Sequence, residues 1–139
     1  MVEQTLCVIK PNAVKKNNIG AIISMIEKTG LVVKGLKMTE LSEKKVSAFY
    51  EEHVGKPFFD GLKAFMTSGK VVAIVLEGEN AISKLRTVMG ATNPEKADEG
   101  TIRKLFADSM TENAVHGSDS PESAAREIAF YFDRFSILD

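Results

Sequence analysis

The sequence has 139 residues, of which 44% are hydrophobic and 27% charged, and its formal net charge is −1. These values are typical of one soluble globular domain over residues 1–139, which buries a core without disulfides or a structural metal. They exclude a whole-molecule attraction to nucleic acid or to an anionic membrane. No signal peptide opens the sequence, no apolar run is long enough to span a bilayer, and the lone Cys7 excludes an internal disulfide. We therefore expect a cytoplasmic protein with no membrane partner and no specific nucleic-acid partner.

Apolar runs and amphipathic segments alternate at the start of the chain. Thr5–Ile9 is an apolar run of strand length and predicts a strand buried on both faces. Isoleucines recur at helical spacing over residues 19–26 and predict a helix that stops at Gly30. Residues 31–41 predict a second, less apolar strand. Lys10, at the end of the first strand, either projects into a site at the edge of the sheet or is an ordinary solvated lysine, which is more typical of an isolated residue.

Two further helices are predicted after the second strand. Ser42 is a typical N-cap of the first of them. Tyr50 lies beside its apolar face, where it either packs or donates its hydroxyl to a phosphate. Phe58 and Phe59 begin the next helix, and because two adjacent aromatics cannot both face one core, one is expected to lie exposed. It is then either a stacking surface for a nucleobase or a bystander. His53 is most simply a half-exposed helix-end residue without the small polar neighbours of a catalytic histidine.

The middle of the chain contains a third strand, a helix and a long segment with little pattern. Residues 71–76 are an unbroken apolar run and predict a second central strand. The helix predicted over residues 82–89 carries Arg86 on its flank. From residue 91 to 113 the hydrophobic periodicity is poor, and a long irregular segment inside a compact domain is often functional. Two of its residues are of types that bind phosphate, although each alone is weak evidence: Thr92 and Arg103.

The stretch N-A-V-H-G-S-D-S, residues 113–120, has the composition of an anion-binding site around His116. Gly117 has no Cβ, so a large anion can approach the backbone and the neighbouring ring. Ser120–Glu122 reads as a helix start, which places the histidine just ahead of a helix N-terminus, where negative charge is favoured. Small polar side chains nearby can hydrogen-bond a phosphate, a sugar or the backbone: Asn113, Ser118 and Ser120.

A carboxylate in the following helix is placed to act on this histidine. An apolar stripe is predicted along that helix, formed by Ala125, Ile128, Ala129 and Phe132. Glu127 lies beside the stripe and is within reach of one imidazole nitrogen, which would fix the tautomer and leave the other nitrogen as a nucleophile. The alternative is a surface histidine in a capped loop with a solvated glutamate.

Buried strands separated by helices predict an α+β sandwich, with a fourth short strand leading into His116. The sequence lacks a G-x-x-x-x-G-K-[S/T] phosphate loop and a Rossmann glycine fingerprint, so side chains would have to hold any nucleotide phosphates. The candidates are the cations Lys10, Arg86 and Arg103 and the neutral donors Tyr50 and Thr92. No metal-ligand cluster is visible in the sequence.

The stretch N-A-V-H-G-S-D-S resembles the active-site signature of the nucleoside diphosphate kinase family, and the short C-terminus is similar to bacterial-type members. The resemblance covers nearly the whole chain, through T-L-C-V-I-K-P, F-Y-x-x-H-x-x-K-P-F-F, M-G-A-T-N-P and A-A-R-E-I-A-F-Y-F. Several blocks in the right order are more specific than one motif. The resemblance implies a ferredoxin-like βαββαβ sandwich with a four-stranded antiparallel sheet covered by helices. It also implies a helical hairpin near residues 42–67 and a protruding loop around residues 91–113.

The resemblance further implies a reaction. The terminal phosphate of a nucleoside triphosphate, mainly ATP, moves to a nucleoside diphosphate by a ping-pong mechanism through a phosphohistidine at His116. Phe58 would stack on the base with Leu62 beside it, and Ser118 and Glu127 would orient the histidine. Contacts to phosphates or ribose are implied for Lys10, Tyr50, Arg86, Thr92, Arg103 and Asn113. Mg²⁺ would arrive on the nucleotide phosphates, and the protein would be a homo-oligomer, either a tetramer or a hexamer.

Two departures from the family pattern lie in the predicted loop. Glu99 stands where many relatives have proline, and Lys104-Leu105 follows Arg103 where many carry a small or acidic pair. Glu99 in place of proline bears on the rigidity of the loop and on subunit contacts, and neither departure removes a proposed catalytic residue.

Two other functions use the same residues. One is a nucleotide-binding regulatory module that has lost turnover, and the other is a phosphohistidine carrier that passes its phosphate to proteins. The complete set of cations argues against the first. The aromatic Phe58 and the three-cation pocket favour small nucleotide acceptors over the second.

Overall fold

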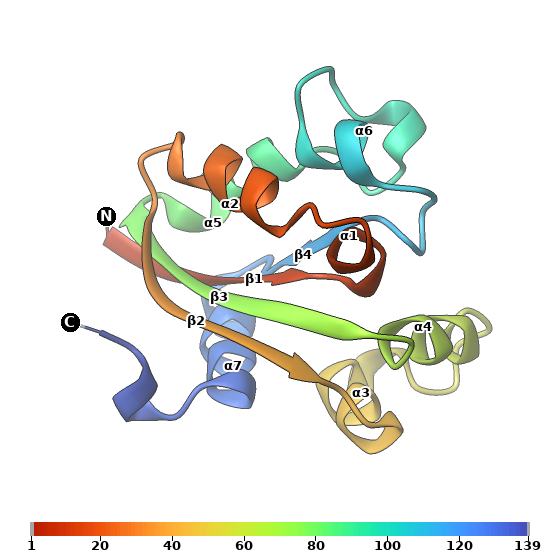
Figure 1. Ribbon diagram of the computed structural model, residues 1–139. Coiled ribbons are helices and arrows are strands. Elements are labelled where there is room, and N and C mark those ends of the chain that lie inside the picture. Colours follow the sequence, from red (N-terminus) through yellow and green to blue (C-terminus); the bar gives the residue numbers. More distant parts are fainter. Residues whose placement is uncertain (1, 139) are drawn as a thin grey trace.

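The computed structural model describes residues 2–138 and consists of a four-stranded antiparallel sheet with helices on both faces (Figure 1). In chain order its elements are β1 (Val2–Ile9), α1 (Pro11–Lys15), α2 (Ile19–Glu27), β2 (Val32–Glu40), α3 (Glu43–Phe49), η1 (Glu51–His53), α4 (Phe59–Met66), β3 (Lys70–Glu79), α5 (Ala81–Met89), η2 (Pro94–Lys96), α6 (Ile102–Phe106), β4 (Val115–Gly117), α7 (Pro121–Tyr131) and η3 (Arg134–Ser136). The strand order β2-β3-β1-β4 is that of the expected ferredoxin-like sandwich. Across residues 2–138, none of the helices combines the length and hydrophobicity that crossing a bilayer requires.

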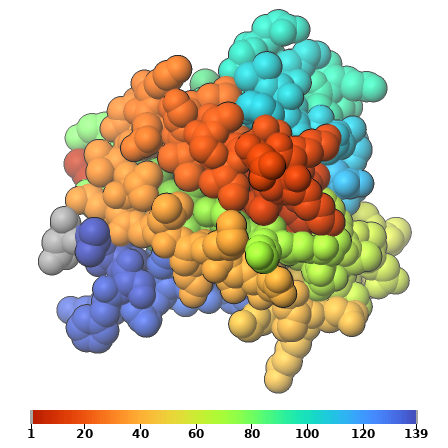
Figure 2. Space-filling model, viewed as in Figure 1, coloured from red at the N-terminus to blue at the C-terminus, as the bar shows by residue number. Residues whose placement is uncertain are grey.

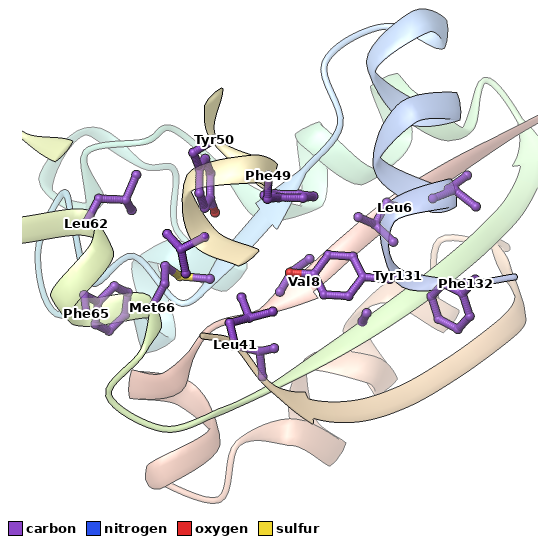
Figure 3. Close-up of a cluster of buried hydrophobic side chains, with 14 of the residues drawn as sticks. Leu6, Val8, Leu41, Phe49, Tyr50, Leu62, Phe65, Met66, Tyr131 and Phe132 are labelled. Atoms are coloured by element: carbon purple, nitrogen blue, oxygen red, sulfur yellow. The ribbon is translucent and has the colours of Figure 1, made fainter. Parts of the chain in front are cut away.

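The two central strands are buried on both faces, as their unbroken apolar runs predicted. β1 pairs with β3 along its whole length, from Val2 opposite Glu79 to Ile9 opposite Val72. Neighbouring residues of β1 alternate between two cores because side chains of a strand point to opposite faces. Leu6 packs with α3, α4 and α7 in the core drawn in Figure 3, whereas the next residue packs with α1, α2 and α5. The central strands are therefore a rigid base for whatever their ends carry.

The edge strand β2 is less buried than its neighbours, as its mixed composition predicted. A bulge interrupts its pairing with β3 between Val33 and Gly35. Three large apolar side chains remain exposed on it: Val32, Leu36 and Met38.

Helix α7 begins where the sequence predicted but buries a different stripe. Ser120 is confirmed as its N-cap, in a reciprocal capping box with Ser123. The predicted stripe was wrong at Ala125 and Ala129, which are exposed. The buried face consists of Ala124, Glu127, Ile128 and Tyr131. Alanine carries little hydrophobic signal, which is why the predicted stripe was wrong at two of its positions, while Glu127 does reach His116 as expected.

The helical hairpin expected near residues 42–67 is formed by α3, η1 and α4, and Ser42 is confirmed as its first N-cap. The expected loop over residues 91–113 stands out from the body of the molecule in Figure 1. It is more ordered than poor periodicity suggested, because it contains η2 and α6. Thr101 caps α6 by accepting a hydrogen bond from the backbone of Lys104.

Candidate active site

Lys10 and His116 are brought together by the pairing of β1 with β4. His116 lies opposite Val8 in this ladder, and the backbone N–H of Lys10 donates to Ala114 O at 2.7 Å. Ala114 has φ 74° and is the centre of a γ-turn, closed by a 2.9 Å hydrogen bond between its two neighbours. This backbone conformation is strained for a residue with a Cβ, and strain of this kind clusters at functional sites. The strained turn immediately precedes β4, the strand that carries His116.

His116 is held by a carboxylate from α7. Its Nε2 lies 2.7 Å from Glu127 Oε1, and Ser118 Oγ donates to the same oxygen at 2.8 Å. Burial alone would raise the pKa of Glu127, but the contacts with His116 and Ser118 outweigh burial and hold that pKa below its usual range. An ionised carboxylate only accepts hydrogen bonds, so Nε2 carries the ring proton. Nδ1 is therefore the nitrogen with a free lone pair. Ser118 is linked to the histidine through the carboxylate of Glu127.

Two aromatic rings restrict the imidazole further. Phe49 meets it edge-on with ring centroids 5.3 Å apart, and Tyr50 does so at 6.0 Å. Both come from the end of α3, so the hairpin forms one wall of the site. The ring cannot rotate freely between these contacts and the carboxylate.

Lys10 is buried, with only 6% of its surface exposed, so the solvated alternative for this residue is wrong. Its Nζ donates to Asn113 Oδ1 at 2.8 Å. Burial, and secondarily the charge of Arg103, lowers the pKa of Lys10 to about 7. The site therefore holds a lysine whose charge is unfavourable until an anion accompanies it.

Two arginines converge on the same region from α5 and α6. Arg86 donates to Gly117 O at 3.2 Å, and Arg103 donates to Gly90 O at 3.0 Å and to Val115 O at 2.9 Å. Burial, and secondarily the charge of Arg86, lowers the pKa of Arg103 to about 10. These cations repel one another, and a bound polyanion would offset that repulsion.

These side chains line one pocket. Its volume is about 370 Å³, which is typical of sites for small ligands. Every predicted site residue lines it except Ser118, which hydrogen-bonds Glu127, and Ser120, which caps α7. The lining residues are Lys10, Phe49, Tyr50, Glu52, His53, Phe58, Leu62, Arg86, Thr92, Arg103, Met110, Thr111, Asn113, His116, Gly117, Asp119, Ser123 and Glu127. They come from the ends of β1 and β4, the α3–α4 hairpin, α5, α7 and the loop over residues 91–113.

Some buried polar atoms on the wall of this pocket have no hydrogen-bond partner within residues 2–138. They are Tyr50 Oη, His53 Nδ1 and Arg103 Nε. Buried polar atoms are normally paired, so unpaired ones that surround a pocket indicate a polar ligand. His53 was expected to be a half-exposed helix-end residue outside the site. It reaches the pocket because its ring stacks against Tyr50 at 6.0 Å and meets Phe58 edge-on at 5.2 Å.

Phe58 and Phe59 divide as the sequence predicted, with one exposed and one buried. Phe58 is 52% exposed and lines the pocket, whereas Phe59 is 5% exposed and packs in the core. Within residues 2–138 no group of three or more histidine, cysteine, aspartate or glutamate side chains is placed to hold a metal ion.

Comparison with known proteins identifies the family. The model of the family described as nucleoside diphosphate kinase matches residues 3–137. The chain belongs to the nucleoside diphosphate kinase family. A nucleoside diphosphate kinase of Bdellovibrio bacteriovorus is 54% identical over 99% of this chain and 98% of its own length. One from Actinobacillus pleuropneumoniae is 55% identical over 99% of this chain and all of its own length.

Solved structures of nucleoside diphosphate kinases have the same fold. The enzyme of Aquifex aeolicus superposes with a TM-score of 0.96 at 42% identity, covering 99% of this chain and 100% of that one. The enzyme of Halobacterium salinarum, solved in complex with CDP, gives 0.96 at 40% identity, covering 100% of this chain and 93% of that one. The relatives that share this chain's sequence, and the solved structures that share its fold, are therefore all nucleoside diphosphate kinases.

Proposed function

We propose that this protein transfers the terminal phosphate of a nucleoside triphosphate, mainly ATP, to a nucleoside diphosphate through a phosphohistidine at His116. The observation that carries this proposal is the contact between His116 Nε2 and Glu127 Oε1, in a pocket that three cations share. A neutral imidazole with one lone pair toward a cationic pocket has the requirements of a phosphate acceptor.

Each half of the reaction makes one bond to phosphorus and breaks one. In the first, His116 Nδ1 attacks the γ-phosphorus, the bond to the bridging oxygen breaks, and the nucleoside diphosphate leaves. In the second, a terminal oxygen of another diphosphate attacks the phosphohistidine and the P–N bond breaks. Lys10, Arg86 and Arg103 would offset the charge spread over the phosphoryl oxygens, which is the main requirement of phosphoryl transfer. Glu127 would keep the proton on Nε2 through both halves.

The remaining site residues would bind the substrate. We assign phosphate or ribose contacts to the neutral donors and acceptors of the wall: Tyr50, Thr92 and Asn113. Phe58 presents an exposed ring to the pocket, with Leu62 beside it, and we assign base stacking to this pair. Stacking does not distinguish one base from another, because every base has a π-face. Purine and pyrimidine nucleotides are therefore both expected as substrates. The CDP complex of the Halobacterium salinarum relative supports a pyrimidine in such a pocket.

We assign Mg²⁺ to the substrate rather than to the protein. Glu127 is committed to His116 and Ser118, and Asp119 accepts from Ser123 Oγ at 2.9 Å. Glu52 is the third carboxylate of the lining, but within residues 2–138 these carboxylates are not grouped to hold a metal ion. The residues present therefore fit an ion held by phosphate oxygens and water, which is common for Mg²⁺ on nucleotides. Bound there, the ion would neutralise phosphate charge alongside the three cations.

We also propose that the chain is one domain that works in the cytoplasm as a homo-oligomer, a tetramer or a hexamer. The exposed Val32, Leu36 and Met38 on the edge strand support a second copy as the partner, because antiparallel strand pairing is self-complementary across a two-fold axis. Buried Cys7 suits a reducing compartment. Light scattering on the wild type and on Leu36→Glu tests the assembly: a stable monomer for both would refute it.

A label-and-chase experiment tests the transfer. Protein is mixed with γ-labelled ATP, separated from nucleotide, and then given GDP or CDP. We expect an acid-labile label that moves into the triphosphate, and no label on a folded His116→Ala variant. A protein that takes no label is a binding module. A label that GDP and CDP cannot remove indicates a carrier with a protein acceptor.

A further inference from the structure

A hydrogen-bonded strut ties the loop that precedes Asn113 to helix α1. The side chain of Asn12 is buried, and its Nδ2 donates to Asp108 Oδ2 and to Glu112 O, both at 2.9 Å. These two acceptors stand at opposite ends of the turn over residues 108–112. The turn is also closed by a 2.7 Å hydrogen bond from Asp108 N to Glu112 O. One amide therefore holds both ends of the turn, and Figure 2 shows this part of the loop against the red segment of α1.

The acceptor in this strut is ionised. Hydrogen bonds from Lys16, and secondarily from Asn12, hold the pKa of Asp108 below its usual range. Lys16 Nζ contacts the second carboxylate oxygen, Oδ1. Hydrogen bonds to a charged acceptor are stronger than neutral ones, so this link is suited to fixing a loop.

The strut runs parallel to a contact inside the pocket. Asn12 follows Lys10 by two residues, and Glu112 immediately precedes Asn113. Lys10 Nζ donates to Asn113 Oδ1 at 2.8 Å, so the same two segments are joined twice, once in the pocket and once behind it. The turn also presents two of its own residues to the pocket: Met110 and Thr111. Loss of the Asn12 hydrogen bonds would leave this wall held behind the pocket by Lys16 and inside the pocket by Lys10.

We propose that Asn12 and Asp108 are positioning residues that fix the 108–113 segment for the phosphate and ribose end of a nucleoside di- or triphosphate. The inference rests on the phosphotransfer proposed above. Neither residue lines the pocket, so their effect reaches the nucleotide through Asn113 and Lys10. His116 and Glu127 belong to β4 and α7, outside the strut. We therefore expect breaking the strut to weaken nucleotide binding and to raise KM by a larger factor than it lowers kcat.

Exchanging the two side chains tests the proposal. Asn12→Asp places a second carboxylate against Asp108 and removes the donor, and we expect the KM for ADP and its Kd by calorimetry to rise roughly tenfold or more. Adding Asp108→Asn to that variant restores one donor and one acceptor with their roles reversed. It should recover much of the lost affinity, although the donation to Glu112 O remains absent.

A matched control is Asp133→Asn. This carboxylate also has a lowered pKa and also closes a turn, accepting from Phe135 N and from Ser136, but the turn belongs to η3. Asp133→Asn should lower Tm without changing KM, whereas the strut variants should change KM beyond any effect on Tm. Unchanged ADP affinity in Asn12→Asp, or no recovery in the exchanged pair, would overturn the proposal.

Two further measurements keep the result decisive. If Asn12→Asp does not fold, Asn12→Ala, Asp108→Ala and their double variant form a thermodynamic cycle for ADP binding. A double loss clearly smaller than the sum of the single losses supports the strut, and an additive loss refutes it. ADP binding is measured without turnover. A wild type that binds ADP but transfers no phosphate would refute the proposed function while leaving the strut to be judged on Kd.

Discussion

His116 Nε2 and Glu127 Oε1 are 2.7 Å apart, although one residue lies on the edge strand β4 and the other on helix α7. This contact decides which ring nitrogen keeps a free lone pair. It also depends on the packing of α7 against β1. The capping box at Ser120 contributes to the contact by fixing the residue at which the helix begins. The chemistry of the site is thus set by the fold as much as by the histidine.

The first prediction concerns this contact. Glu127→Gln removes the charge that holds the Nε2 proton, and a hydrogen bond to a charged group contributes about 1.5–3 kcal/mol. We expect phosphohistidine formation to slow by roughly ten- to a hundredfold, measured by rapid quenching with γ-labelled ATP. Glu122→Gln, in the exposed first turn of the same helix, is the control and should react like the wild type. An unchanged rate in Glu127→Gln would show that the carboxylate does not set the tautomer.

The second prediction concerns pH and Lys10. Its pKa is lowered from 10.5 to about 7 in the folded protein, so the unfolded chain binds more protons between these values. The free energy of unfolding should therefore gain a contribution that rises with pH across this window. Lys10→Met should remove that pH dependence in denaturant titrations. It should also weaken nucleotide binding.

Phosphate should reverse the effect of burial on Lys10, because its negative charge favours the ammonium form. Binding of ADP at about pH 8.5, inside the titration window, should therefore take up a proton. Calorimetry in buffers of different ionisation enthalpy measures this uptake. Equal uptake by the wild type and by Lys10→Met would assign the proton to another group.

The third prediction separates two buried tyrosines. Tyr50 Oη and Tyr131 Oη are both buried without a partner in the described residues, but only Tyr50 lines the pocket. Replacing either by phenylalanine removes an unsatisfied hydroxyl and should not lower Tm. Tyr50→Phe should reduce kcat/KM roughly tenfold, by the loss of one hydrogen bond to phosphate, and Tyr131→Phe should leave it unchanged. Equal activity in both variants would remove Tyr50 from the site.

The fourth prediction uses the adjacent aromatics of α4. Phe58→Ala should raise KM for purine and pyrimidine nucleotides alike, since stacking contributes about 1–3 kcal/mol per base, and should barely change Tm. Phe59→Ala should destabilise the fold by roughly 3–5 kcal/mol, because it leaves a cavity in the core. Steady-state kinetics and thermal melts distinguish the two. A KM effect for one base class only would contradict recognition by stacking alone.

Local sequence patterns predicted the helices and strands, because the formation of these elements depends largely on residues that are near one another in the sequence. The central strands were predicted from their apolar runs, and the starts of α3 and α7 from their serine caps. The order of the strands followed only from the family resemblance. The burial of Lys10 was not legible, since it follows from β4 pairing beside it. The contact between Glu127 and His116 was predicted and is present, whereas the buried stripe of α7 was wrong at Ala125 and Ala129, because alanine is compatible with either face of a helix.

Contacts between distant segments account for what sequence reasoning missed. His53 is an exception, because it reaches the pocket by packing on its near neighbours Tyr50 and Phe58, all within one of the blocks that carry the family resemblance. Asn12 and Asp108 are 96 residues apart in the sequence, and neither belongs to a recognisable motif. Pairings over such separations appear only when the chain is folded.

The short ladder between β1 and β4 has a consequence for how substrate preference can evolve. It locks Lys10 and His116 in one register, so moving either would require the sheet to be rebuilt. The groups assigned to the base lie instead on the α3–α4 hairpin, which mutation can reshape without disturbing that ladder. Selectivity among bases can therefore change by substitution at Phe58 and Leu62 while Lys10 and His116 keep their positions.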